Sequence, residues 1–148
     1  MAFRSILVPV DYSEPSRRAL ELALSLDETA EVTVVHAWDR PQYVGEELVA
    51  HPDGSRRSLS ELIRENAERE MTDFLARVKT PAGKTFKHHL ITGDPVAAII
   101  AEAGKPGYDV IVVGTHGRTG MTKLLLGSVT EKLIRLSPIP ILTVPPAR

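Results

Sequence analysis

The sequence contains no cysteine among its 148 residues. Without thiols the protein forms no disulfide, no thiolate zinc site, no iron–sulfur cluster and no cysteine nucleophile. It also lacks an excess of charge of one sign, because 18 basic residues face 19 acidic ones. No global field therefore draws the chain to nucleic acid or anionic lipid. No apolar run approaches the roughly 20 residues that a membrane helix needs, so we expect no membrane insertion.

What the sequence does contain is typical of a globular protein. Hydrophobic residues make up 43% and charged residues 25% of the chain, which is too apolar for disorder. The length is within the usual range of one domain, so residues 1–148 are interpreted as a single domain. The apolar stretch near the start is broken by Pro9 and followed by Asp11, unlike a signal peptide. These features predict a soluble, cytoplasmic, single-domain protein.

Short apolar runs alternate with segments of helical spacing along the chain. The apolar runs, which predict strands, are residues 6–10, 32–38, 85–91, 108–113 and 139–144. The helical segments, most of them opened by Ser or Asp at a capping position, are residues 13–26, 58–78, 94–104 and 128–136. Strands that alternate with helices favour right-handed crossovers. The prediction is an α/β fold: one doubly wound, five-stranded parallel sheet with helices on both faces.

Residues 39–57 interrupt this alternation. They include Pro41, Gly45, Pro52 and Gly54 and show no clear period, so we predict a long loop. Loops of this length are uncommon and often serve as lids or binding segments, whereas others are disordered. The sequence leaves both interpretations open.

The ends of two strands are the places to look for function, because ligands of doubly wound sheets lie beyond the carboxyl ends of the strands. Asp11 follows the first strand, and a glycine-rich loop begins at Gly114 after the fourth. Glycines allow the backbone to approach an anion closely. The loop ends at Gly127-Ser128, where the N-terminus of a helix favours negative charge. The pattern indicates a phosphate site.

Side chains in and beside this loop suit the same ligand. Ser128, Thr130 and Thr119 offer hydroxyls, and Arg118 and Lys123 can screen phosphate charge. The alternative is structural, since residues 128–131 (Ser-Val-Thr-Glu) have the pattern of a capping box, in which Ser128 only caps the helix.

The spacing of four residues carries a resemblance to a known family. Gly114, Gly117, Gly127 and Ser128 fit the pattern G-x2-G-x9-G-[ST]. This pattern resembles the signature of the ATP-binding branch of the universal stress protein family. The similarity extends over essentially the whole chain, from the first strand to the last strand at residues 139–144.

The resemblance implies an adenine nucleotide, ATP or another, as the ligand, and it leaves open whether magnesium accompanies the phosphates. It places Asp11 near the ribose or a metal, the Ala37 backbone at the adenine edge, and Val113 against the base. Asp11 has the alternative of capping the first helix or turn. The site residues that the resemblance implies are Pro9, Val10, Asp11, Ala37, Val113, Gly114, Gly117, Gly127, Ser128, Val129 and Thr130.

Three residues outside this signature attract attention but favour ordinary roles. Trp38 ends the second strand, where packing is more usual than stacking on a base. His88 and His89 are adjacent, so on a strand they point to opposite faces and do not chelate one metal together. We expect them at the surface or at an edge.

The last strand is expected at an edge of the sheet. Pro138 and Pro140 remove N–H donors from one side of it, and proline is confined to edge strands. The family resemblance implies a homodimer formed through this region.

Two hypotheses about activity stay open at this stage. One is a regulatory protein that binds an adenine nucleotide, and the other is an ATP-hydrolysing or autophosphorylating enzyme. Hydrolysis needs a positioned water and charge stabilisation at the γ-phosphate, for which the candidates are His116, Arg118 and Asp11. The sequence identifies no partner for any of them, so we favour binding with slow or absent hydrolysis. A third possibility is an interaction module of the same fold that binds no nucleotide.

Overall fold

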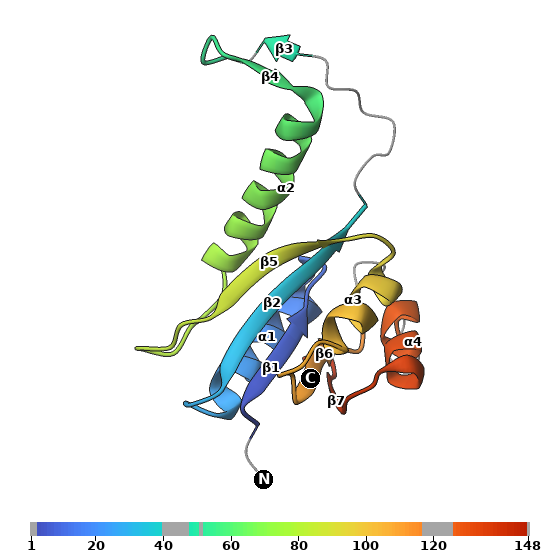
Figure 1. Ribbon diagram of the computed structural model, residues 1–148. Helices are drawn as coiled ribbons and strands as arrows, with labels where there is room; N and C mark the ends of the chain where they lie inside the picture. The colour runs from blue at the N-terminus through green and yellow to red at the C-terminus, as the bar shows by residue number, and fades with distance from the viewer. Residues whose placement is uncertain (1–2, 40–47, 51, 117–125, 148) are drawn as a thin grey trace.

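A computed structural model describes residues 3–39, 48–50, 52–116 and 126–147 of the chain. Its centre is a sheet of five parallel strands in the order β5-β2-β1-β6-β7 (Figure 1). These strands are β1 (Ser5–Pro9), β2 (Glu31–Trp38), β5 (Lys87–Thr92), β6 (Val110–Gly114) and β7 (Ile141–Val144). The helices are α1 (Glu14–Leu26), α2 (Leu59–Ala76), α3 (Pro95–Ala103) and α4 (Ser128–Leu136). The predicted doubly wound α/β fold is confirmed, and β7 is an edge strand as expected.

The sheet divides the core into two layers because side chains alternate along each strand. In β1, Ile6 and Val8 pack with α1 and with the C-terminal half of α2. Leu7 points to the opposite face and packs with α3 and α4. The central strands are therefore buried on both sides, which explains their nearly continuous apolar sequences. Among the described residues no helix is long and apolar enough to cross a membrane.

Three helices begin at the polar residues that the sequence indicated. The Ser13 side chain accepts a hydrogen bond from the Ser16 amide at 3.3 Å at the start of α1. Ser58 accepts from the Glu61 amide at 3.2 Å, and Asp94 accepts from the Ala97 amide at 3.0 Å. Each cap satisfies an amide that the helix itself leaves unpaired.

The prediction of one continuous loop over residues 39–57 is wrong for part of that segment. β3 (Leu48–Ala50) and β4 (Arg56–Ser58) form an antiparallel hairpin, and Gly54 turns between them with a φ of +87°. Residues 40–47 and 51 lie outside the described ranges, so the lid hypothesis is not tested there. The hairpin escaped prediction because its short strands are largely exposed and carry no alternating apolar face.

The hairpin continues into the first half of α2, and we call β3, β4 and residues 59–67 the arm. Figure 1 shows the arm extending away from the central sheet. The buried residues of α2, Met71 and Phe74, lie in its second half. The helix is therefore attached to the sheet at one end only.

A buried carboxylate fastens α3 to the sheet. Glu102 accepts a hydrogen bond from the Tyr108 hydroxyl at 2.9 Å and lies 2.8 Å from Lys105 Nζ and 3.3 Å from His89 Nε2. Burial alone would raise the pKa of Glu102, but Lys105, Tyr108 and His89 together hold it below its usual value. Burial and the bond to Glu102 raise the pKa of Tyr108 to about 12. These contacts fix the C-terminal end of α3 against β5 and the segment that leads into β6.

Candidate functional site

A cavity of about 300 Å³ lies where the carboxyl ends of β1, β2 and β6 meet α3 and the start of α4. The strand order reverses between β1 and β6, so the cavity occupies the switch point of the sheet. Ten of the eleven predicted site residues line it: Pro9, Val10, Asp11, Ala37, Val113, Gly114, Gly127, Ser128, Val129 and Thr130. The eleventh, Gly117, lies outside the described residues, as do Arg118, Thr119 and Lys123.

The end of β1 is held in place by its neighbour β2. The Val10 amide donates to the Val35 carbonyl at 2.8 Å, and His36 Nδ1 lies 2.7 Å from the Val10 carbonyl oxygen. Because a carbonyl only accepts, Nδ1 of His36 is the donor in this hydrogen bond. The His36 ring also stacks on Tyr12 with centroids 4.2 Å apart. Backbone and side chain together hold the segment that carries Asp11.

Asp11 closes the turn that leads from β1 into α1. Its carboxylate accepts from the Ser13 amide at 3.0 Å and from the Ser13 hydroxyl. Tyr12 between them adopts a φ of +66°, in the left-handed region that few non-glycine residues occupy. Asp11 therefore caps the turn, which was the structural alternative to a role in ligand binding. The cap of α1 itself is Ser13. The same carboxylate lines the cavity.

Gly114, at the end of β6, is favoured by close packing. A Cβ atom at this position would lie 3.1–3.2 Å from backbone and side-chain atoms of Pro15 in the first turn of α1. Contacts this short are tighter than most Cβ atoms make, so the first turn of α1 would have to move by a few tenths of an ångström. Packing against α1 therefore explains the first glycine of the signature without any ligand.

Thr130 links α4 to β6. Its side chain is buried, and its hydroxyl donates to the Gly114 carbonyl at 2.8 Å. A threonine hydroxyl has one hydrogen, so this bond leaves none for a phosphate. The backbone amide of Thr130, rather than its hydroxyl, is the donor that remains for a ligand.

The N-terminus of α4 differs from the predicted capping box. Gly127, not Ser128, is the N-cap residue, and no side chain caps the helix. The alternative in which Ser128 merely caps α4 is therefore wrong. The first helical bond runs from the Glu131 amide to the Gly127 carbonyl at 3.0 Å, so the amides of residues 128–130 precede it. Three such amides and the helix dipole favour an anion at this end of the cavity.

Five lining residues were not predicted at all: Ser16, His36, Pro95, Ile99 and Leu133. Ile99 and Leu133 belong to inward-facing helical stripes, whose period gave a usable signal. His116, which the sequence suggested only for hydrolysis, also lines the cavity and is buried. Its Nδ1 lies 2.8 Å from the Thr115 hydroxyl oxygen. Within the described ranges no three acidic or histidine side chains are grouped as a metal site.

The sheet order and the position of the cavity define a doubly wound α/β protein with its ligand site at the switch point. The model of the universal stress protein family matches residues 2–145. The chain therefore belongs to the universal stress protein family.

Individual relatives agree with this assignment. Universal stress protein MJ0531 of Methanocaldococcus jannaschii is 33% identical over 147 residues, which cover 96% of this chain and 82% of the relative. The solved structure of MJ0577 from the same organism is 27% identical, with a TM-score of 0.75 over 100% of this chain and 99% of that one. A universal stress protein solved in complex with cAMP shares the fold at 24% identity and a TM-score of 0.62, covering 97% and 98% of the two chains.

Proposed function

We propose that this protein binds an adenine nucleotide, ATP in the first instance, in the cavity at the switch point. The single observation that carries the proposal is that this cavity runs from apolar walls to the uncapped start of α4. A nucleotide has the matching polarity, with a flat base at one end and phosphates at the other. The structural neighbour with cAMP and the G-x2-G-x9-G-[ST] pattern of this sequence support an adenine nucleotide in particular.

The apolar walls suit the base. Val10, Val113 and Ile99 line the cavity beside Ala37 at the end of β2. The backbone amide and carbonyl of Ala37 would form hydrogen bonds with the edge of adenine, because main-chain groups supply fixed donors and acceptors in such pockets. The cavity volume of about 300 Å³ is at the lower end of the usual range for small-molecule sites.

The phosphates would occupy the other end. The amides of Ser128, Val129 and Thr130 would donate to phosphate oxygens, and the exposed Ser128 hydroxyl is available as well. Asp11 is the acidic group that the described lining offers to a divalent cation. One carboxylate does not make a magnesium site, so magnesium would arrive bound to the nucleotide.

Binding without efficient hydrolysis is the activity that we propose. Hydrolysis of ATP needs a polar group that positions water in line with the γ-phosphate. Of the candidates, Asp11 holds the turn at Ser13, and Nδ1 of His116 is bonded to Thr115. Both side chains are engaged in hydrogen bonds within the protein, which favours binding over hydrolysis. We therefore propose a regulatory nucleotide binder of the stress response.

Calorimetric titration of Mg·ATP into nucleotide-stripped protein tests this proposal. We expect saturable binding of one nucleotide per chain with a micromolar Kd, which corresponds to about −8 kcal/mol. Absence of heat from protein shown to be stripped and folded would contradict the proposal. The fold would then serve as an interaction module without a nucleotide.

We also propose a homodimer formed through β7. The Pro140 and Val144 carbonyls accept hydrogen bonds from Ile111 and Thr115 on the β6 side. Side chains and backbone groups alternate along a strand, so the backbone of Thr143 faces the open edge. Apolar side chains are exposed nearby on α4, where Ile134 is 47% and Leu136 is 59% exposed. A second copy that pairs along β7 would cover both features.

Replacing Thr143 by proline tests the dimer. Proline removes the outward-facing amide but is tolerated on an edge strand, so the monomer should stay folded. We expect sedimentation velocity to show a dimer for the wild type and a dissociation constant at least roughly tenfold higher for Thr143→Pro. Equal dimerisation of both proteins, or a monomeric wild type, would contradict an interface at β7.

A further inference from the structure

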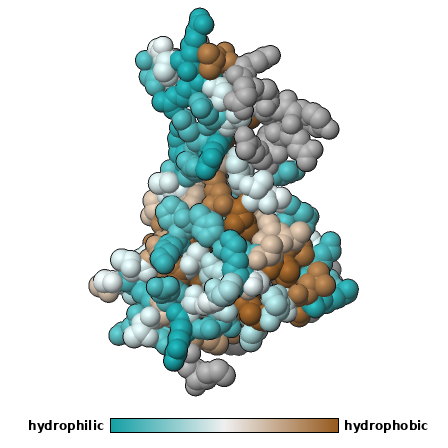
Figure 2. Space-filling view, viewed as in Figure 1, coloured by the Kyte–Doolittle hydropathy of each residue, from teal (hydrophilic) through white to brown (hydrophobic). Residues whose placement is uncertain are grey.

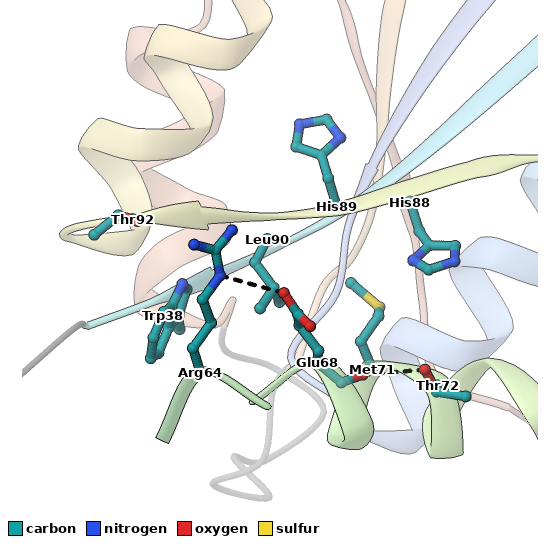
Figure 3. Close-up of a pocket in the computed structure, with 9 residues that line it drawn as sticks. All are labelled: Trp38, Arg64, Glu68, Met71, Thr72, His88, His89, Leu90 and Thr92. Atoms are coloured by element: carbon teal, nitrogen blue, oxygen red, sulfur yellow. Dashed lines mark hydrogen bonds and ion pairs between the residues drawn. The ribbon is translucent and has the colours of Figure 1, made fainter. Parts of the chain in front are cut away.

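A second cavity, of about 470 Å³, lies between α2 and the edge strand β5 (Figure 3). It exists because α2 is attached by its second half, where Met71 and Phe74 are buried, and diverges from the sheet toward the arm. On α2 its lining residues lie three to four positions apart, so they share one face of the helix. We call this cavity the α2–β5 groove.

The floor of the groove is apolar. Met71 of α2, Leu90 of β5 and Trp38 at the end of β2 line it together. Figure 3 shows the Leu90 side chain on the α2 side of the sheet and that of His89 on the opposite side, where it meets Glu102. Figure 2 shows hydrophobic surface exposed where the arm joins the body of the molecule. The floor consists of an indole, a leucine side chain and a methionine thioether, which suit a flat hydrophobic group.

Hydrogen-bond donors without partners stand above this floor. Arg64 uses its Nε for Glu68, at 3.3 Å, and its two terminal amino groups bond to none of the described residues. The same holds in the described ranges for the Trp38 indole N–H and for the His88 ring. Among the other polar groups here, Thr72 donates its hydroxyl to the Glu68 carbonyl at 3.1 Å. The groove therefore offers free donors of a guanidinium and an indole, beside the second carboxylate oxygen of Glu68, and the strongest donor is the guanidinium.

We propose that the α2–β5 groove binds a small aromatic carboxylate, independently of the nucleotide cavity. The aromatic body would lie on Trp38, Leu90 and Met71. The carboxylate would take the two free amino groups of Arg64, whose planar fork matches a carboxylate in a bidentate arrangement. Glu68 offsets the charge of Arg64 but leaves the terminal amino groups available. The two cavities share no lining residue, so we expect both ligands to bind at once.

The chain contains one tryptophan, Trp38, whose fluorescence reports on the groove directly. The probe is 3-phenylpropanoate, titrated into nucleotide-stripped protein, and the matched neutral compound is 3-phenylpropanamide. We expect a saturable change of Trp38 emission with a Kd on the order of 1 mM, as the size of the probe allows. The amide should bind about tenfold more weakly because it lacks the charge that Arg64 recognises.

Two variants of α2 make the assignment specific. Arg64→Gln should weaken binding of 3-phenylpropanoate about tenfold, whereas Arg69→Gln on an exposed position of the same helix should leave it unchanged. The Arg64 side chain is 70% exposed, so its replacement should not disturb folding. No saturable change, equal binding of acid and amide, or equal affinity of the Arg64 variant would each overturn the proposal.

The same titration in saturating Mg·ATP separates this proposal from the first one. We expect an unchanged Kd for 3-phenylpropanoate. Competition with Mg·ATP would mean that the probe enters the nucleotide cavity, which would overturn the groove as its site. If the protein binds no nucleotide at all, the groove is still tested by Arg64→Gln and its control.

Discussion

Replacing Gly127 by leucine is expected to weaken the binding of Mg·ATP at least roughly 100-fold, about 2.7 kcal/mol. Gly127 is the N-cap residue of α4 and lines the cavity next to the three free amides. A leucine side chain there would fill the space through which the phosphates reach those amides. Its φ of −59° and ψ of 147° suit any residue, so the backbone need not change. The expected loss is therefore one of binding and not of folding.

Gly104→Leu is the matched control for this variant. Gly104 ends α3 at an exposed position with a φ of −75°, and a Cβ atom there meets only ordinary contacts at 3.5 Å. Calorimetry should give the wild-type Kd for this protein. Circular dichroism and thermal melting of both variants show whether each remains folded. Wild-type affinity in a folded Gly127→Leu protein would mean that the glycine loop does not hold the phosphates.

Sequence alone predicted where most of the cavity lining would be. Strand ends such as Val10-Asp11 and Val113-Gly114 are far apart in the chain but adjacent in a sheet with a switch point. The alternation of strands and helices predicts that sheet, and parallel strands bring their carboxyl ends to one edge. The order of elements pointed to Asp11 and to the loop that begins at Gly114, and the resemblance to the universal stress protein family supplied the other residues of the predicted site.

The individual bonds inside the site could not be predicted in the same way. The Thr130 hydroxyl donates to the Gly114 carbonyl, and the short distance between Gly114 and Pro15 favours glycine. Both facts depend on how closely α1 and α4 approach the sheet. Residue type and spacing do not determine that distance, so a pattern that is typical of a ligand site also satisfies internal packing.

The α2–β5 groove was beyond prediction for a related reason. The apolar stripe of α2 continues through Leu59, Leu62 and Ile63, which suggests a helix packed along its whole length. In the structure Leu59 is 40% exposed, and the buried residues of the helix are Met71 and Phe74. The direction in which a helix leaves a sheet depends on tertiary contacts at its attached end, which a periodic pattern does not specify.

Phe74 is the main contact at that attached end. Its side chain is 1% exposed, and its ring lies 5.3 Å from the ring of Tyr12 at an angle of 45°. Tyr12 in turn stacks on His36, which bonds to the Val10 carbonyl beside the cavity at the switch point. A continuous set of packed rings therefore connects α2 to the turn that carries Asp11.

Phe74→Ala is expected to lower the free energy of unfolding by about 3–5 kcal/mol, because it removes a large buried side chain and leaves a void. Leu59→Ala, on the exposed part of the same helix, should cost less than about 1 kcal/mol. Urea denaturation of both variants checks the difference. A nucleotide at 100 times its Kd would restore about 2.7 kcal/mol to any variant whose site is intact. If Phe74→Ala gains less from Mg·ATP than Leu59→Ala does, then the stacked rings also position the cavity at the switch point. Equal gains would limit Phe74 to anchoring α2.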